Sequence, residues 1–333
     1  MRRFLNQLLR SRALVFVGLL VFFILWGLRA SGVLWGDGVA MGTLSAFGHT
    51  LSLTPWVAAV AEILLVLFNA FMIYVMANEY ALYNSRAYFG VVLFLAVMGG
   101  PLFVVSTLSG LLGLAVFTLM LYVLWSTFQQ RQAVSEYLLS FALIGAVTIV
   151  SPKWMLLVPF FFVGSTLLHS MSMRVFIASL LGFVTPYWIA AGILFLSDEM
   201  GNFLIPFQQL AALSPLGFGG VPAGGYVSLA LVLFLSLPSL AVYPSSAYLV
   251  KERARVCYLY MMVVSVGVIL MCLLQPLTMG EFLPMLLFMA CIFVTQMLIS
   301  SRDRFGSTYL LLFLILFGLY VAVPFWGSAL IFD

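Results

Sequence analysis

The sequence predicts an all-α fold of the polytopic membrane class, with about eleven transmembrane helices. Of its 333 residues 65% are hydrophobic and only 7% are charged, whereas soluble domains carry about 25% charged residues. Apolar runs long enough to cross a bilayer recur along the whole chain. These runs lack the alternation that a transmembrane β-barrel would show. Soluble enzymes, nucleic-acid-binding proteins, secreted disulfide scaffolds and disordered chains are therefore excluded.

The first predicted span, 13–28, follows an arginine-rich start, Met1–Arg12. This pattern resembles a signal peptide, but further spans follow and no cleavage site is evident, so an uncleaved helix with a cytoplasmic start is favoured. The other predicted spans are 56–76, 87–105, 110–125, 137–150, 154–168, 175–196, 226–243, 256–274, 282–299 and 308–330. The odd total predicts that the C-terminus lies outside.

The basic residues support this topology through the positive-inside rule. Twelve of the 14 fall in segments that the spans place in the cytoplasm, and only Arg29 and Lys153 fall outside. The lopsided distribution favours the predicted number and order of spans. The twelve are Arg2, Arg3, Arg10, Arg12, Arg86, Arg131, Arg174, Lys251, Arg253, Arg255, Arg302 and Arg304.

The loops are too short to hold a soluble domain, so the chain is expected to form one integral-membrane domain, 1–333. Two outer segments, 29–55 and 197–225, are longer than turns. The apolar middle of the second, Phe203–Leu213, is expected to lie along the membrane interface. The three cysteines have no metal-binding or redox spacing and are expected to be small packing residues.

Two acidic residues are candidates for chemistry on the outer side. Glu62 follows Trp56 by six residues, about 9 Å along a helix, and is the one ionisable residue expected deep in a span. It lines a polar outward site or is a protonated, hydrogen-bonded structural residue. Asp37 lies between two glycines, and it is a general base or metal ligand, or else a turn-forming aspartate. A divalent metal is thus possible, although no cofactor is certain.

The two outer cations and one histidine complete the candidate site. Lys153, in the turn Ser-Pro-Lys-Trp, is placed to meet the phosphate of a lipid or of a lipid-linked donor, or to reach toward lipid headgroups without a catalytic role. Arg29 is a second phosphate-binding candidate. His49 is a base or ligand in the first outer loop, or incidental. We expect Asp37, Glu62 and Lys153 to converge on one outward cavity.

The order of these features resembles the integral-membrane glycosyltransferases of the GT-C type, which use polyprenyl-phosphate-linked sugars. One crossing is followed by an outer loop with an acid, Asp37. The stretch ALIGAVTIVSPKWMLLVP, residues 142–159, is similar to their apolar helix, small-residue stretch with a lysine, and proline-containing helix. The resemblance covers roughly residues 1–200, followed by an outer interfacial segment and four further spans in 201–333. It implies that Asp37 is the catalytic carboxylate and that Lys153 contacts the donor phosphate.

The chain also resembles an uncharacterised family of polytopic membrane proteins of Bacteroidota. The residues that match are Asn84-Ser85-Arg86 before the third span and Arg174, Gly182 and Pro186 in the seventh. This match implies no activity.

Three functions therefore remain open at this point. The first is a GT-C-like transferase, or an inactive relative, at the outer face of the inner (cytoplasmic) membrane, with membrane lipid and a polyprenyl-phosphate-linked sugar as partners. The second is a non-enzymatic component of an envelope assembly or transport system. The third is a carrier or flippase for lipid-linked material.

Overall fold

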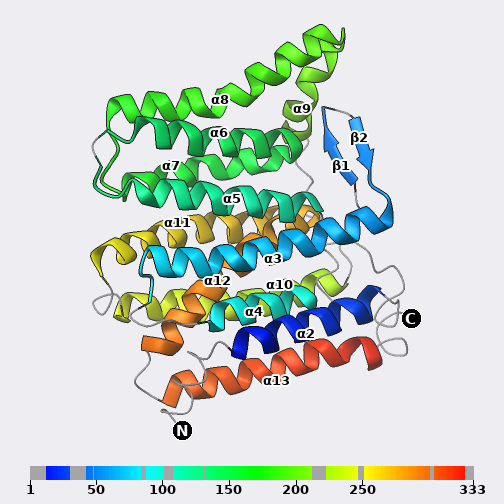
Figure 1. The fold of residues 1–333 in the computed structure, drawn as a ribbon, viewed down its shortest axis with the longest axis vertical. Helices are drawn as coiled ribbons and strands as arrows, with labels where there is room; N and C mark the ends of the chain where they lie inside the picture. Colours follow the sequence, from blue (N-terminus) through cyan, green and yellow to red (C-terminus); the bar gives the residue numbers. More distant parts are fainter. Residues whose placement is uncertain are drawn as a thin grey trace.

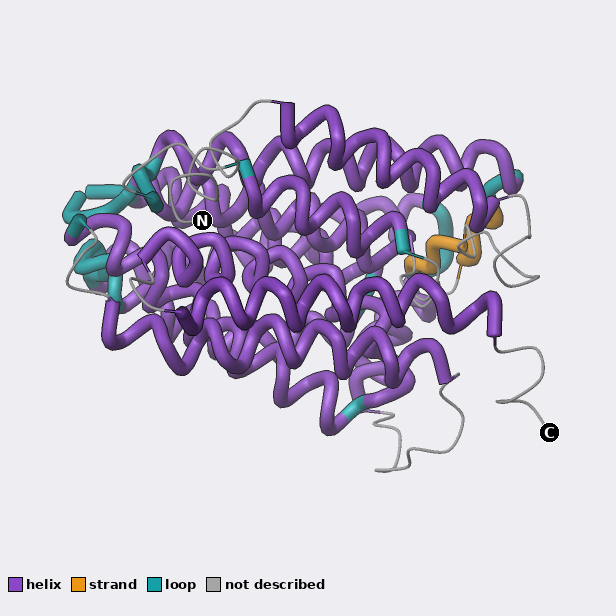
Figure 2. The backbone as a smooth tube through the Cα atoms, turned by 90° about the horizontal axis from the view of Figure 1, so that it is seen from below, coloured by secondary structure: helices purple, strands orange, loops and turns teal. Residues whose placement is uncertain are grey.

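The computed structural model is a bundle of helices that lie side by side along one common direction (Figures 1 and 2). It describes residues 13–30, 43–47, 49–83, 88–100, 108–130, 132–211, 223–246, 251–300 and 304–326. The α-helices are α2 (Ala13–Ala30), α3 (Pro55–Glu79), α4 (Phe89–Gly99), α5 (Leu108–Ser126), α6 (Val134–Val150), α7 (Val158–Thr166), α8 (Met173–Leu196), α9 (Ile205–Ala211), α10 (Ala223–Ser246), α11 (Glu252–Leu274), α12 (Met279–Ser300) and α13 (Arg304–Trp326). Short 3-10 helices are η2 (Pro152–Leu157), η3 (Met200–Leu204) and η5 (Pro276–Thr278).

Five of the described helices are long and apolar enough to cross a membrane, and the all-α prediction is confirmed. They are Pro55–Glu79, Leu108–Ser126, Met173–Leu196, Glu252–Leu274 and Pro276–Ile299. The shorter apolar helices are Ala13–Leu28, Phe89–Gly99, Val134–Val150, Gly225–Ala241 and Leu311–Val321.

The predicted span 154–168 begins as a 3-10 helix and continues directly as an α-helix. The structure divides it into η2 and α7, with Pro152 and Pro159 each at the start of its helix. Proline is favoured there because the first N–H groups of a helix have no partner inside it, and proline has none to lose. The chain turns at Ser151, where α6 ends and η2 begins.

The centre of the bundle is α12. Buried residues make up 94% of its most apolar stretch, compared with 22% for α8, which lies at the edge of the bundle. α12 packs against α3, α4, α5, α10 and α11. An apolar helix that is surrounded by protein has no lipid-facing side, which explains why its sequence shows no polar face.

Glycines allow close helix contacts at both edges of the bundle. At Gly182 of α8, a Cβ would lie 2.3 Å from the carbonyl oxygen of Leu138 on α6, and at Gly145 of α6 it would lie 2.4 Å from that of Phe183. α2 approaches α4 in the same way, since a Cβ at Gly99 would lie 3.1 Å from the Phe22 backbone. Helices in membranes associate through such small-residue contacts, because burial from lipid adds no hydrophobic driving force.

A β-hairpin in the first long loop was not predicted. Strands β1 (Thr43–Ala46) and β2 (His49–Ser52) pair antiparallel, with Thr43 opposite Ser52 and Ala46 opposite His49. The turn contains Phe47 at a φ of 50°, and its ring stacks on Phe203 with 6.4 Å between ring centroids. Strands of four residues are too short to show a clear period, so the segment reads as a loop.

The segment Phe203–Leu213 was expected to lie along the interface. Its described part belongs to η3 and the short helix α9, and α9 packs against η2. The three cysteines are buried and unpaired by disulfides, which agrees with their predicted packing role.

At one end of the bundle, Arg253 of α11 joins α3 to α5. Its guanidinium lies 4.8 Å from the ring centroid of Tyr80, just after α3, and its Nη2 donates to the Trp125 carbonyl of α5 at 3.4 Å. The Tyr80 hydroxyl donates to the Tyr122 carbonyl on the same helix. The Arg253 side chain of α11 thus contacts the ends of both α3 and α5. We call this the Arg253 end.

Replacing Arg253 by alanine should lower the free energy of unfolding by about 1–2 kcal/mol, because a cation–π contact and a charged hydrogen bond are lost together. Unfolding in mixed micelles, followed by circular dichroism, measures the change. Lys251→Ala, an exposed lysine beside α11, is the matched control and should change the free energy by less than about 0.5 kcal/mol. Equal effects of the two substitutions would contradict the contact's role.

Candidate functional site

Lys153 lies at the opposite end of the bundle, in the turn between α6 and α7. Ser151 ends α6 with its N–H bonded to the Val147 carbonyl at 2.8 Å, and its own carbonyl accepts from the Trp154 N–H at 3.0 Å. Pro152 begins η2 immediately afterwards. The chain therefore reverses within a few residues, with Lys153 half-buried at the surface of this end. We call it the Lys153 end.

Glu281, in the first turn of α12, is the acidic partner of Lys153 and was missed by the sequence analysis. The Ser151 side chain and the Lys153 ammonium both lie near its carboxyl group and interact with it electrostatically. Its Oε2 is buried and has no hydrogen-bond partner among the described residues. A carboxylate in the first turn is also favoured by the helix dipole. A lysine and a glutamate from distant parts of the sequence therefore lie near each other in one polar cluster.

Glycine at position 110 allows this arrangement. A Cβ at Gly110, in the first turns of α5, would lie 2.8 Å from the Glu281 Cα and 2.8 Å from the Gly280 carbonyl oxygen. Any larger residue would displace the start of α12. The sequence signal that could have found Glu281 is its place between two apolar segments, but the predicted span was begun one residue too late, at Phe282. The statement that Glu62 is the one deep ionisable residue is thereby corrected.

Trp154 packs in the core directly after Lys153 and supports the cluster of Ser151, Lys153 and Glu281. It is 1% exposed, and its ring lies 5.8 Å from that of Phe282 and 6.5 Å from that of Phe117, measured between centroids. Gly113 leaves room for the indole, because a Cβ there would lie 2.6 Å from it. Lys153 therefore projects from a rigid turn whose next residue is anchored in the core.

Glu62 is buried, with 3% of its surface exposed, on the same face of α3 as Asn69. The Asn69 Oδ1 lies 3.4 Å from the Thr118 hydroxyl oxygen on α5. α3 and α5 run in the same direction, since Tyr80, just after α3, meets Trp125 at the end of α5. Glu62 lies seven residues before Asn69 on α3, and the residue seven before Thr118 is at the start of α5. Glu62 is therefore level with the start of α5, where Gly110 packs against α12. Glu62 is thus at the Lys153 end, at the depth of Glu281.

The remaining predicted site residues lie beyond what the structure describes in side-chain detail. Asp37 is outside the described residues. Arg29 lies in the last turn of α2 and His49 in β2, with only their backbones described. The structure therefore brings Lys153 and Glu62 to one end of the bundle, adds Glu281, and leaves the predicted convergence with Asp37 as a prediction.

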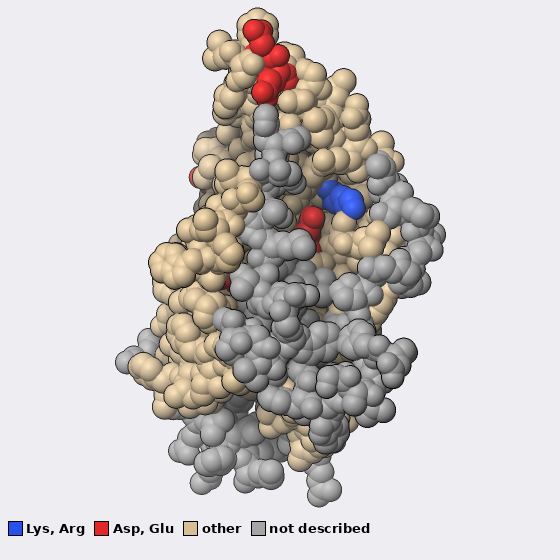
Figure 3. Space-filling model, turned by 90° about the vertical axis from the view of Figure 1, so that its right-hand side faces the viewer, with Lys and Arg blue, Asp and Glu red and all other residues tan. Residues whose placement is uncertain are grey.

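Among the residues that the structure describes, charged side chains are sparse on this face. Figure 3 shows the Lys153 end of the bundle. Acidic side chains lie at the top of this view, and a basic side chain lies close to an acidic side chain in a hollow below them. Asp198 and Glu199 follow α8, where Glu199 accepts from the Asn202 amide at 3.3 Å. Within the described part of the chain, no group of three His, Cys, Asp or Glu side chains could hold a metal ion.

The fold and this site define a class: an all-helical membrane protein with a lysine–glutamate cluster at one end of its bundle. Comparison with known protein families, curated proteins and solved structures finds no match to the chain.

Proposed function

We propose that this protein is a membrane-embedded transferase that takes a sugar from a polyprenyl-phosphate donor at the Lys153 end. The observation that supports it most is that the turn with Ser151 and Lys153, anchored by buried Trp154, lies near Glu281 at the start of α12. A lysine ammonium is a point charge suited to phosphate, and tight packing beneath it fixes where that charge lies. The GT-C-like order of Asp37 and Lys153 in the sequence supports the same function.

In the proposed reaction, an acceptor hydroxyl oxygen forms a bond to the anomeric carbon while the bond from that carbon to the donor phosphate breaks. Asp37 takes the hydroxyl proton, and the phosphate leaves on its polyprenyl chain with Lys153 as its counterion. Arg29 would add a second positive charge. Before the donor binds, electrostatic attraction to Glu281 would lower the cost of holding an ammonium near the membrane core. Glu62 and His49 would line the site.

The distribution of charge supports an orientation with the Lys153 end outside the inner membrane. Four described cations lie at the Arg253 end: Arg174, Lys251, Arg253 and Arg255. Within the described side chains, Lys153 is the one cation at the other end. The positive-inside rule then favours a cytoplasmic Arg253 end, the eleven predicted spans, a cytoplasmic N-terminus and an outer C-terminus.

Binding of polyprenyl phosphate, the proposed product, tests the role of Lys153. The protein in nanodiscs is titrated with polyprenyl phosphate and analysed by native mass spectrometry. Lys153→Ala should weaken binding about tenfold or more, since hydrogen bonds to charged groups contribute about 1.5–3 kcal/mol. Lys251→Ala, a lysine at the other end, should bind as the wild type does. Unchanged binding by Lys153→Ala would overturn the phosphate assignment.

Glycan analysis tests the transferase activity separately. A deletion strain is complemented with the wild type or with Asp37→Asn, and its surface glycans are compared by mass spectrometry. The proposal expects the wild type, but not Asp37→Asn, to restore the missing glycan at matched protein levels. Full restoration by Asp37→Asn and by Lys153→Ala would favour the non-enzymatic envelope role instead.

A further inference from the structure

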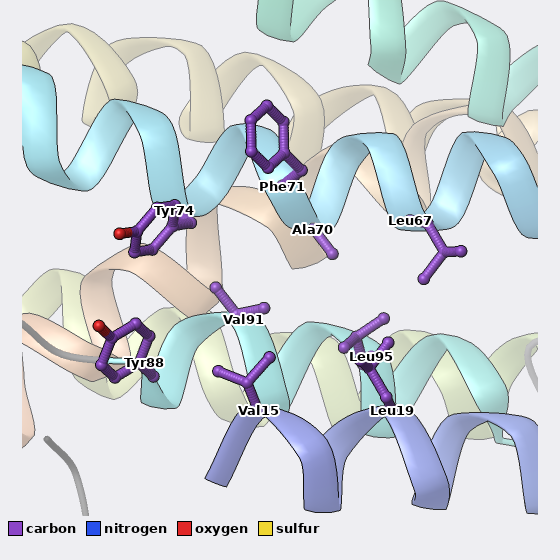
Figure 4. Close-up of a pocket in the computed structure, with 9 residues that line it drawn as sticks. All are labelled: Val15, Leu19, Leu67, Ala70, Phe71, Tyr74, Tyr88, Val91 and Leu95. Atoms are coloured by element: carbon purple, nitrogen blue, oxygen red, sulfur yellow. The ribbon is translucent and has the colours of Figure 1, made fainter. Parts of the chain in front are cut away.

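An apolar cavity of about 300 Å³ lies between α2, α3 and α4 (Figure 4). Its lining has no charged side chain and consists of Val15, Leu19, Leu67, Ala70, Phe71, Tyr74, Tyr88, Val91 and Leu95. A protein cavity of about 150 Å³ with a lining of this kind stays dry and binds benzene. A cavity of about twice that volume, with so few polar partners for water, is suited to a hydrocarbon.

The cavity exists because α2 is held on α4 and not on α3. A Cβ at Gly18 of α2 would lie 3.1 Å from Val92 of α4, and the close contact of Gly99 with Phe22 has the same effect at the other end of the pair. α2 makes little contact with α3 along the described residues. The space between them is bounded on the far side by Ala70, whose side chain is too small to fill it.

The cavity is an apolar slot parallel to the helices, and two tyrosine hydroxyls lie beyond one of its ends. Leu67, Leu95 and Leu19 lie at one end, and Tyr74 and Tyr88 lie at the other, with their phenol oxygens on the same side (Figure 4). The two rings stack with 5.7 Å between centroids. Tyr74 is five residues from the end of α3, and Tyr88 directly precedes α4, so the tyrosine end of the slot faces the Arg253 end.

The exposure of the residues at the edge of the slot indicates that its hydrocarbon ligand comes from the lipid bilayer. Phe71 and Tyr74 are 59% and 37% exposed, so the edge of the slot opens to the side of the bundle, where lipid lies. Tyrosines near helix ends mark the level of the headgroups. From Leu67 to Tyr74 the slot extends about 10 Å along the helix axis, in the direction that lipid chains take.

We propose that this slot binds one acyl chain of a phospholipid from the leaflet at the Arg253 end. The chain lies between α2, α3 and α4, and the phenols of Tyr74 and Tyr88 donate hydrogen bonds to its ester oxygens. Attraction between helices and lipid tails is not hydrophobic, so selective binding arises from the contacts that an empty slot would lose. The lipid would fill the space between α2 and α3 that the side chains leave empty. This inference is independent of the proposed transferase activity.

Photocrosslinking tests the slot directly. The protein is reconstituted in nanodiscs with phosphatidylglycerol carrying a diazirine within one acyl chain, irradiated, and digested for mass spectrometry. Peptides from α3 and α4 that line the slot should be labelled about tenfold more than those of the exposed face of α8, which corresponds to a preference of about 1.4 kcal/mol. Equal labelling of the two regions would overturn the proposal.

Ala70→Leu fills the slot and should reduce the labelling of α4 severalfold without changing that of α8. Val91→Phe fills it from the other side, which keeps the test valid if one variant does not fold. Leu64→Phe, an exposed position on α3 outside the slot, is the matched control and should leave labelling unchanged. Labelling of α4 that persists in both filled variants would contradict the proposal. Displacement of the label by unlabelled polyprenyl phosphate would instead identify an isoprenoid occupant and overturn the acyl assignment.

Discussion

Replacing Trp154 by alanine is expected to lower the free energy of unfolding by about 3–5 kcal/mol, the usual loss for a buried Trp or Phe. The indole is 1% exposed and packs against Phe282 and Phe117, and the absence of a side chain at Gly113 leaves room for it. Its removal leaves a void that cannot collapse, because three separate elements, η2, α5 and α12, border it. The cavity term applies inside a membrane protein as well, since the lining atoms lose van der Waals contacts.

Trp154→Phe separates ring packing from the indole N–H. The Nε1 atom is buried without a hydrogen-bond partner among the described residues, so phenylalanine keeps an aromatic ring and removes an unsatisfied donor. We expect a loss of about 1–3 kcal/mol, smaller than for alanine, because the single ring fills part of the space of the indole and no unsatisfied N–H remains. Unfolding in mixed micelles gives both free energies. Equal losses for Trp154→Ala and Trp154→Phe would show that a phenylalanine ring does not replace the packing of the larger indole.

Trp154→Ala should also weaken polyprenyl phosphate binding, although the variant retains Lys153. The ammonium is held by the turn that Trp154 anchors, so a loosened turn spreads the charge over many positions. Binding measured well below the melting temperature of the variant separates this effect from unfolding. Wild-type affinity in a folded Trp154→Ala variant would show that Lys153 needs no rigid support.

Gly182→Ala is expected to destabilise the contact between α6 and α8 by about 1–3 kcal/mol, the usual cost of overpacking. The added Cβ would lie 2.3 Å from the Leu138 carbonyl oxygen, an atom of helix backbone that cannot move aside alone. The two helices must separate instead, which also disturbs the hydrogen bond of 2.9 Å from the Tyr187 hydroxyl to Thr148. Helix propensity acts in the opposite direction, since alanine is favoured over glycine by about 1 kcal/mol.

Gly192→Ala is the matched control on the same helix. A Cβ at Gly192 has no atom within 4 Å, so the exchange should leave stability unchanged or raise it by up to about 1 kcal/mol. Thermal unfolding in detergent, followed by size-exclusion chromatography of heated samples, ranks the two variants. A Gly182→Ala variant as stable as Gly192→Ala would mean that α6 and α8 are not closely packed.

Lys153 and Glu62 were identified from the sequence because charge is scarce in it. In an apolar chain each ionisable residue stands out, and its depth can be estimated from its distance to the end of a span. Glu281 was missed for a related reason. The predicted span began at Phe282, so the glutamate was counted with a loop, whereas η5 and the first turn of α12 extend the helix past it.

The sequence by itself determined the class of the protein, the approximate positions of its helices and the separation of its basic residues. These depend on local hydropathy and charge, which each segment carries whatever its neighbours are. Only the tertiary structure shows that α12 is the buried centre of the bundle and that Lys153 lies near Glu281. It also shows that an apolar slot separates α2 from α3. Those features depend on which helices pack together. Where all helix surfaces are apolar, the packing partners of a helix are determined by how the shapes of glycine, tryptophan and other side chains fit together. Those side chains are distant in the sequence, so the hydrophobic pattern does not predict which helices pack together.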